Sequence, residues 1–131
     1  MIKKLSHVSL LTKDLNKVYK FYVQILGLKV VHKFANDRKE LYGLFLYTGK
    51  GTFIEFFKNN KKKLSKTYDH ICFEVDNIYE TKKKFDKITK IEVKRGKTDK
   101  VLQFKVKDYE NNIIEFHQHD NKSKLKDYLD E

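Results

Sequence analysis

Apolar and polar residues alternate in short stretches along the first half of the chain, and each stretch predicts a β-strand with one buried face. The strands are expected at 5–12, 28–34, 41–48 and 52–57. After the first strand, Asp14 is an N-cap candidate for a helix that Gly27 ends. The apolar positions of this helix are Leu15, Val18, Tyr22 and Ile25. The first half therefore predicts a β-α-β-β-β module.

The second half of the chain repeats this pattern. Its strands are expected at 68–75, 90–94, 101–107 and 112–119. Asn77 and Glu80 have the spacing of a capping box at the start of a helix, which continues through Ile78, Lys82, Phe85 and Ile88. When His7 is placed on His70 and Glu55 on Glu115, the residues around them match as well. The chain therefore carries one module twice.

The duplicated module predicts an α+β fold and a domain plan. We expect a single domain at 1–120, made of two βαβββ repeats at about 5–58 and 68–119 that a linker at 58–67 joins. The repeats are expected to form a curved mixed sheet around a cavity, with the helices outside. A polar C-terminal tail follows at 121–131.

Strand alternation places one histidine and one glutamate of each module on the mixed face, opposite the apolar face. They are His7, Glu55, His70 and Glu115. One such residue alone is more often structural or solvated, but the repetition favours a shared role. Two imidazoles and two carboxylates suit one divalent metal ion, and this donor set does not distinguish Ni, Zn, Co, Mn or Fe.

The motifs in these modules resemble those of the vicinal oxygen chelate superfamily, which includes glyoxalase I, extradiol dioxygenases, fosfomycin resistance enzymes and bleomycin resistance proteins. The resemblance covers about residues 5–119. It rests on His7-Val8-Ser9-Leu10-Leu11-Thr12-Lys13-Asp14-Leu15, on Phe21-Tyr22, on Leu26-Gly27-Leu28 and on Ile113-Ile114-Glu115-Phe116. The presence of Glu55 resembles the glyoxalase I branch, whereas dioxygenases and fosfomycin enzymes typically use a set that matches His7, His70 and Glu115.

The glyoxalase I resemblance implies a metal-dependent lyase or isomerase that acts through a metal-bound enediolate. Glu115 would be the catalytic base and Glu55 its counterpart. The resemblance also implies a homodimer, and it leaves open whether the site is completed within one chain or across the dimer. The alternatives are a thiol transferase or extradiol dioxygenase with a His-His-Glu site, and a non-catalytic small-molecule-binding protein.

Two departures from the glyoxalase I pattern concern the substrate. Leu11 stands where that family has an arginine that helps to bind glutathione, and the usual Asp-Pro-Asp-Gly-Asn turn is replaced by Asp108-Tyr109-Glu110-Asn111-Asn112. Asn can adopt the left-handed turn conformation that Gly normally supplies. The thiol cofactor is therefore left open, although a thiol adduct remains a candidate substrate.

Several further residues are candidates for binding the substrate or for packing. The substrate-binding candidates are Tyr68, Arg95, Lys105 and His117. Charged residues in loops are more often simply solvated, so the alternative is that these residues lie at the surface and bind no substrate. We expect Cys72 to be a small buried filler, and His32 and His119 to lie at the surface.

Composition narrows the classes of function. Lys and Arg number 29 against 18 Asp and Glu, a net charge of +11, but the cations are spread along the chain and only Arg38 and Arg95 are arginines. This favours attraction of small anions over nucleic-acid binding, and it disfavours capture of a cationic drug. The chain has no apolar run of about 20 residues, so no membrane span is predicted. With a single cysteine and no signal-peptide pattern, we expect a cytoplasmic location.

Overall fold

The computed structural model describes residues 1, 4–59, 68–87 and 90–129, which fall into two units. The units are Met1–Lys66 and Thr67–Glu131. Their boundary lies in the predicted linker at 58–67, most of which is outside the described residues.

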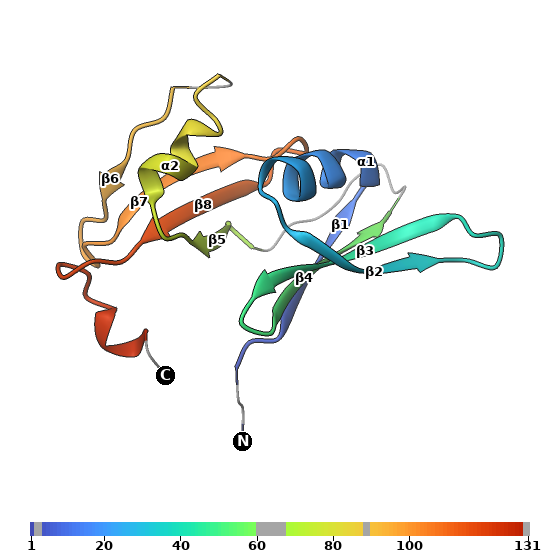
Figure 1. Ribbon diagram of the computed structural model, residues 1–131, viewed down its shortest axis with the longest axis horizontal. Helices are drawn as coiled ribbons and strands as arrows, with labels where there is room; N and C mark the ends of the chain where they lie inside the picture. The colour runs from blue at the N-terminus through green and yellow to red at the C-terminus, as the bar shows by residue number, and fades with distance from the viewer. Residues whose placement is uncertain (2–3, 60–67, 88–89, 130–131) are drawn as a thin grey trace. The chain divides into compact units, whose positions relative to one another are not determined.

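The first unit has the predicted β-α-β-β-β order. Its elements are β1 (His7–Thr12), α1 (Leu15–Val18) with its π-helical continuation η1 (Tyr19–Ile25), β2 (Lys29–Ala35), β3 (Leu41–Gly49) and β4 (Thr52–Lys58). The strands form a sheet in the order β1-β4-β3-β2, in which β1 is parallel to β4 and the other neighbours are antiparallel (Figure 1). The Asp14 carboxylate accepts a hydrogen bond from the Asn16 N–H at 2.9 Å, and Gly27 has a φ of +78° after the helix, as the sequence predicts.

The second unit has the same topology. Its elements are β5 (Ile71–Glu74), α2 (Ile78–Lys83), β6 (Lys94–Arg95), β7 (Leu102–Lys107), β8 (Ile113–Gln118) and the 3-10 helix η2 (Lys126–Tyr128). The sheet order is β5-β8-β7-β6, again with the first and last strands of the module parallel. The Asn77 side chain accepts from the backbone N–H groups of Tyr79 and Glu80, both at 3.1 Å. The tandem βαβββ fold is therefore confirmed, as two four-stranded mixed sheets.

Some element bounds differ from the prediction in the second unit. The strand expected at 90–94 is reduced to Lys94–Arg95, since the Gly96 N–H bonds the Val101 carbonyl and begins a turn there. The helix leaves α-geometry after Lys83, and the Phe85 N–H bonds the Lys82 carbonyl in a tighter turn. The predicted helical position Ile88 lies outside the described residues.

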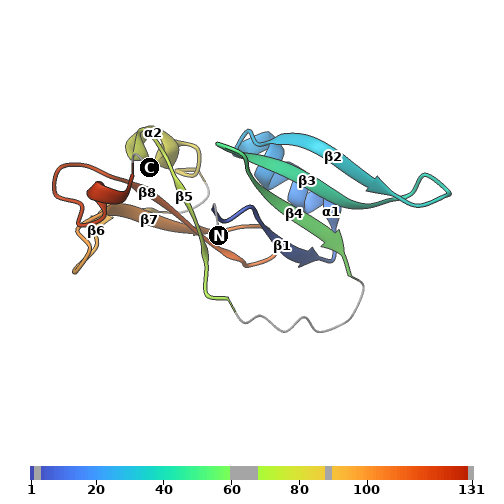
Figure 2. The ribbon, with the colours of Figure 1, turned by 90° about the horizontal axis from the view of Figure 1, so that it is seen from below.

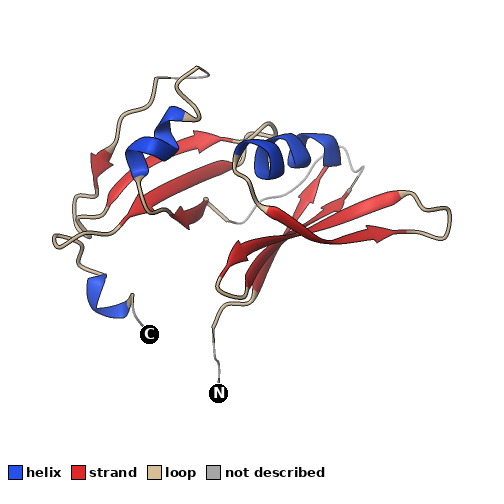
Figure 3. Ribbon diagram, in the orientation of Figure 1, coloured by secondary structure: helices blue, strands red, loops and turns tan. Residues whose placement is uncertain are grey.

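In each unit a helix packs on the apolar face of the sheet, as Figures 2 and 3 show. In the first unit, Tyr22 packs on Phe56 with ring centroids 4.7 Å apart, and Ile54 beside it is 1% exposed. In the second, Phe85 packs on Phe116 at 5.6 Å. The opposite face of each sheet therefore carries the mixed set of side chains. The cavity that the sheet was expected to surround stays a prediction. Among the described residues, no helix combines the length and apolar character needed to cross a bilayer.

Candidate metal centre

The first unit brings His7 and Glu55 together. His7 lies opposite Phe53 and Glu55 lies opposite Ser9 across the parallel pair β1 and β4, so the two side chains are diagonal neighbours on one face. His7 Nε2 is 3.4 Å from Glu55 Oε1. The Glu55 side chain is 15% exposed and that of His7 is 44% exposed, so the carboxylate is the more buried partner.

The second unit repeats this pair with His70 and Glu115. Glu115 lies opposite Cys72 across β5 and β8, which is the register of Glu55 opposite Ser9. His70 Nε2 is 3.5 Å from Glu115 Oε2. The two modules therefore deliver the same pair of donor groups with nearly the same separation.

His70 has an additional partner that fixes its ring. Its Nδ1 lies 2.7 Å from Asp69 Oδ2, and this hydrogen bond lowers the pKa of the Asp69 carboxyl. A carboxylate on one ring nitrogen leaves the other for a metal ion and raises its basicity. In His70 that other nitrogen is Nε2, which faces Glu115.

The donor chemistry of the two pairs fits a divalent transition metal. Each pair offers one imidazole nitrogen and one carboxylate oxygen, the mixed ligands that Zn, Ni, Co, Mn and Fe(II) accept. The structure brings each histidine to the glutamate of its own module. Convergence of the two pairs on one ion stays a prediction.

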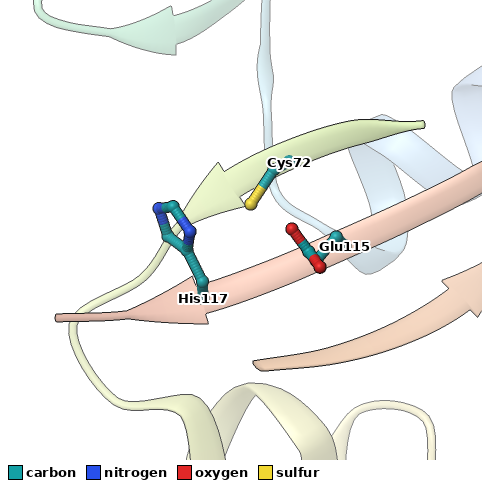
Figure 4. Close-up of side chains that lie close together, drawn as sticks. All are labelled: Cys72, Glu115 and His117. Atoms are coloured by element: carbon teal, nitrogen blue, oxygen red, sulfur yellow. The ribbon is translucent and has the colours of Figure 1, made fainter. Parts of the chain in front are cut away.

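Cys72 and His117 surround Glu115 (Figure 4). One ligand atom from each of these three residues lies within 4.8 Å of the others. Burial, and then the hydrogen bond and the charge of Glu115, raise the pKa of the Cys72 thiol well above its ordinary value. The thiol is therefore protonated and acts toward Glu115 as a neutral neighbour. Burial and the nearby His119 lower the pKa of His117.

Of the substrate-binding candidates, Tyr68 and Arg95 are occupied within their own unit. The Tyr68 hydroxyl donates to Asn112 Oδ1 at 2.6 Å, and burial raises the pKa of Tyr68. Arg95 donates two hydrogen bonds to the Asp120 carboxylate, at 2.9 and 3.0 Å, and a third to the Lys100 carbonyl at 2.7 Å.

Lys105 and His117 lie beside the His70 and Glu115 pair. Lys105 is exposed and pairs with Glu115 across β7 and β8, and its charge contributes to the lowered pKa of Asp69. These two candidates are therefore on the face that carries the donor groups.

His119 is more buried than the sequence predicts. His32 is exposed, as expected, but the His119 side chain is 7% exposed and its Nδ1 lies 2.7 Å from Ser123 Oγ. The expectation of a surface position was wrong because the chain after β8 turns back over this histidine. The signal that was available is the strand spacing of Glu115, His117 and His119.

Residues 4–116 match the model of the glyoxalase/bleomycin resistance protein/dioxygenase superfamily. The chain belongs to this superfamily. This superfamily member is 29% identical to the fosfomycin resistance protein FosX of Listeria innocua over 134 residues, covering 98% of each chain. It is also 29% identical to lactoylglutathione lyase of Schizosaccharomyces pombe over 101 residues, covering 57% of this chain and 33% of the relative, so the match spans about a third of that enzyme's length.

A solved structure supports the fold of this superfamily member. The glyoxalase family protein from Enterococcus faecalis superposes with a TM-score of 0.71 at 19% identity, covering 88% of this chain and 97% of the other. This likeness supports the tandem βαβββ fold, and the family match confirms the resemblance in the sequence motifs at the level of the superfamily.

Proposed function

We propose that the protein is a metal-dependent lyase or isomerase of the glyoxalase type, acting on a small substrate with two vicinal oxygens. In this proposal His7, Glu55, His70 and Glu115 together bind one divalent metal ion. The observation that carries it is the duplicated pair, with separations of 3.4 Å and 3.5 Å at the same strand register.

The burial of the two glutamates supports a cation. The Glu55 and Glu115 side chains are 15% and 11% exposed, and Glu55 lies opposite Phe45 across β3 and β4. A carboxylate loses hydration in such surroundings, so a positive ion is a physical reason for its presence. When bound, a divalent metal would polarise the substrate's oxygens and make the neighbouring C–H more acidic.

Within this proposal Glu115 moves the proton. Its carboxylate would take the proton from a carbon next to the carbonyl and return it to the adjacent carbon, which requires hydrogen-bond reach of both. The Cys72 thiol lies beside this carboxylate and is protonated, so it adds no charge there. Lys105, exposed on the neighbouring strand, would attract an anionic part of the substrate.

A second candidate is a fosfomycin resistance-type enzyme such as a thiol transferase. The similarity to FosX favours action on fosfomycin, whatever the co-substrate, because that match covers 98% of both chains whereas the match to lactoylglutathione lyase covers 33% of that enzyme. In this case His7, His70 and Glu115 would hold the metal and Glu55 would be dispensable.

The Glu55→Gln variant separates the two candidates. For the glyoxalase-type enzyme we expect metal affinity to fall at least tenfold and turnover of hemithioacetals to be lost. Unchanged affinity, together with activity on fosfomycin and a thiol, would favour the second candidate. The matched control is Glu40→Gln, which changes an exposed glutamate of the same unit.

Metal stoichiometry tests whether the pairs share one ion. We expect His7→Ala and His70→Ala each to remove one ion per chain, and the double variant to remove the same single ion. Loss of two ions in the double variant would show two separate sites. No change in bound metal in either variant would overturn the proposal.

We include a homodimer in this proposal, and mixed variants show which chain completes the site. If the two pairs come from different chains, mixing the His7→Ala and His70→Ala proteins restores an intact site in the mixed dimer. If both pairs belong to one chain, the mixture binds no more metal than its components.

A further inference from the structure

A second cluster of metal-ligating side chains lies in the second unit, at Glu74, His117 and His119. One ligand atom from each of them lies within 4.8 Å of the other two. None of the three belongs to the proposed metal centre, so the cluster needs an explanation of its own.

Strand geometry places Glu74 and His119 further along the strands than the His70 and Glu115 pair. Glu74 lies opposite His117 across β5 and β8, and His119 follows two positions later on the same face. Glu74 and His119 therefore repeat the diagonal of His70 and Glu115 further along the strands. At about 3.3 Å per residue, Glu74 and His119 are displaced by roughly 13 Å from His70 and Glu115 along the strands, and His117 lies between the two sets, with a ligand atom within 4.8 Å of one of Glu115.

The histidines are positioned for ligation. Their rings lie 4.4 Å apart, and His119 Nε2 is 3.9 Å from Glu74 Oε1. His119 Nδ1 is held at 2.7 Å by the hydroxyl of Ser123, which is 2% exposed. When Nδ1 donates its proton to that hydroxyl, Nε2 keeps its lone pair on the side of Glu74. This is the orienting contact that metal-bound histidines typically have.

The first module serves as an internal comparison. The repeat places Leu11 on Glu74, Phe57 on His117 and Asn59 on His119. The duplicated scaffold therefore supports apolar side chains at two of these positions. The triad of ligating groups is particular to the second module, unlike the pair that both modules carry.

We infer that Glu74, His117 and His119 form a second site for a divalent transition metal ion, with Zn²⁺ as the probe of choice. Two imidazoles and one carboxylate suit zinc, whose bonds to N and O are about 2.0–2.2 Å. The Glu74 side chain is 61% exposed and free to rotate the short distance that closes the triad. The ion would join β5 to the turn after β8 and clamp the second unit.

The test uses the full-length protein after removal of metal with a chelator, in the His70→Ala background that lacks the proposed first centre. We expect Zn²⁺ titration, followed by calorimetry, to show one ion per chain. His119→Asn, the residue of the first module, should abolish this binding, and Glu74→Gln should weaken it at least tenfold. The control Glu92→Gln changes an exposed glutamate of the same unit and should have no effect.

Ser123→Ala keeps all three ligands and is expected to weaken Zn²⁺ binding 10- to 100-fold. Circular dichroism shows whether each variant is folded. The inference is overturned if His70→Ala protein binds no Zn²⁺, or if folded His119→Asn and Glu74→Gln proteins bind it as His70→Ala does. A failure of the proposed function gives a different result: His70→Ala protein then binds as much metal as wild-type protein.

Discussion

The histidine ligands of the two modules differ in the residue that precedes them. Asp69 holds Nδ1 of His70 at 2.7 Å, whereas Ser6 stands before His7. A hydroxyl at the end of a short side chain cannot supply the negative charge that a carboxylate places on an imidazole. His70 is therefore the better oriented of the two proposed nitrogen ligands.

Replacement of Asp69 tests this difference. We expect Asp69→Asn to weaken metal binding 10- to 100-fold, because the ring loses the carboxylate that orients it. Equilibrium competition with a chromophoric chelator measures the effect. Asp76→Asn, an exposed aspartate of the same unit, is the control. Equal affinities of the two variants would remove the orienting role of Asp69.

At the scale of elements, an ion pair ties β6 to the chain after β8. Arg95 in β6 and Asp120 share two hydrogen bonds, and this contact lowers the pKa of the Asp120 carboxyl from 3.8 to about 2. A carboxyl with a lower pKa in the folded protein stabilises it above the unfolded pKa and loses this contribution as the pH falls through the folded value. The ion pair therefore contributes at neutral pH and disappears between about pH 4 and 2.

The pH dependence of unfolding measures this contribution. We expect the urea midpoint of wild-type protein to exceed that of Asp120→Asn by a small, constant amount above about pH 5, since the pair is partly exposed. The difference should vanish near pH 2. A difference that is unchanged at pH 2 would assign the effect of the substitution to something other than the charge.

The turn between β7 and β8 forms without proline or glycine. Asn111 has a φ of +65°, and the Asp108 carboxylate accepts from the N–H groups of Glu110 and Asn112 at 2.9 Å. The expectation that Asn adopts the left-handed conformation here is confirmed. The turn keeps its shape through side-chain hydrogen bonds instead of a ring.

Substitutions at Asn111 distinguish backbone strain from lost contacts. Asn111→Gly should leave the free energy of unfolding nearly unchanged, whereas Asn111→Val should lower it by about 1–2 kcal/mol, because a β-branched residue resists positive φ. Urea unfolding gives both values. Equal losses in the two variants would show that the Asn side chain, and not the backbone conformation, stabilises the turn.

The sequence predicts most elements because their signals are local. Caps such as Asp14 and Asn77 are confirmed, as is the core position of Ile114 and Phe116. The two-residue β6 and the burial of His119 were missed, and the burial depends on the contact of His119 with Ser123 in the segment after β8. The likeness of the two His–Glu pairs was predictable from the repeat, but the Asp69 and Ser123 contacts were not, because side-chain direction is set by the neighbouring strand and turn.

At the scale of the whole molecule, the proposed shared ion links the stability of both units. A ligand that binds only the folded protein raises its unfolding temperature, and the stabilisation grows with the logarithm of the ligand concentration divided by Kd. We expect Zn²⁺ or Ni²⁺ to raise the unfolding temperature by several degrees, and His7→Ala and His70→Ala each to lose the shift that comes from the shared ion. Differential scanning calorimetry checks this, with Glu40→Gln as control. A shift that survives in His7→Ala at full size would exclude this histidine from the ion.

The parallel pairing of the outer members of each module has a consequence for how ligands are assembled. In both units the histidine comes from, or directly before, the earliest strand, and the glutamate from the latest, so the whole module separates them in the chain. A chain interrupted anywhere inside a module loses that donor pair entirely, whereas one interrupted between modules keeps both. Metal affinity would thus depend on each repeat being intact. Duplication of a complete repeat in an ancestral chain would add a donor pair, whereas duplication of a fragment would not.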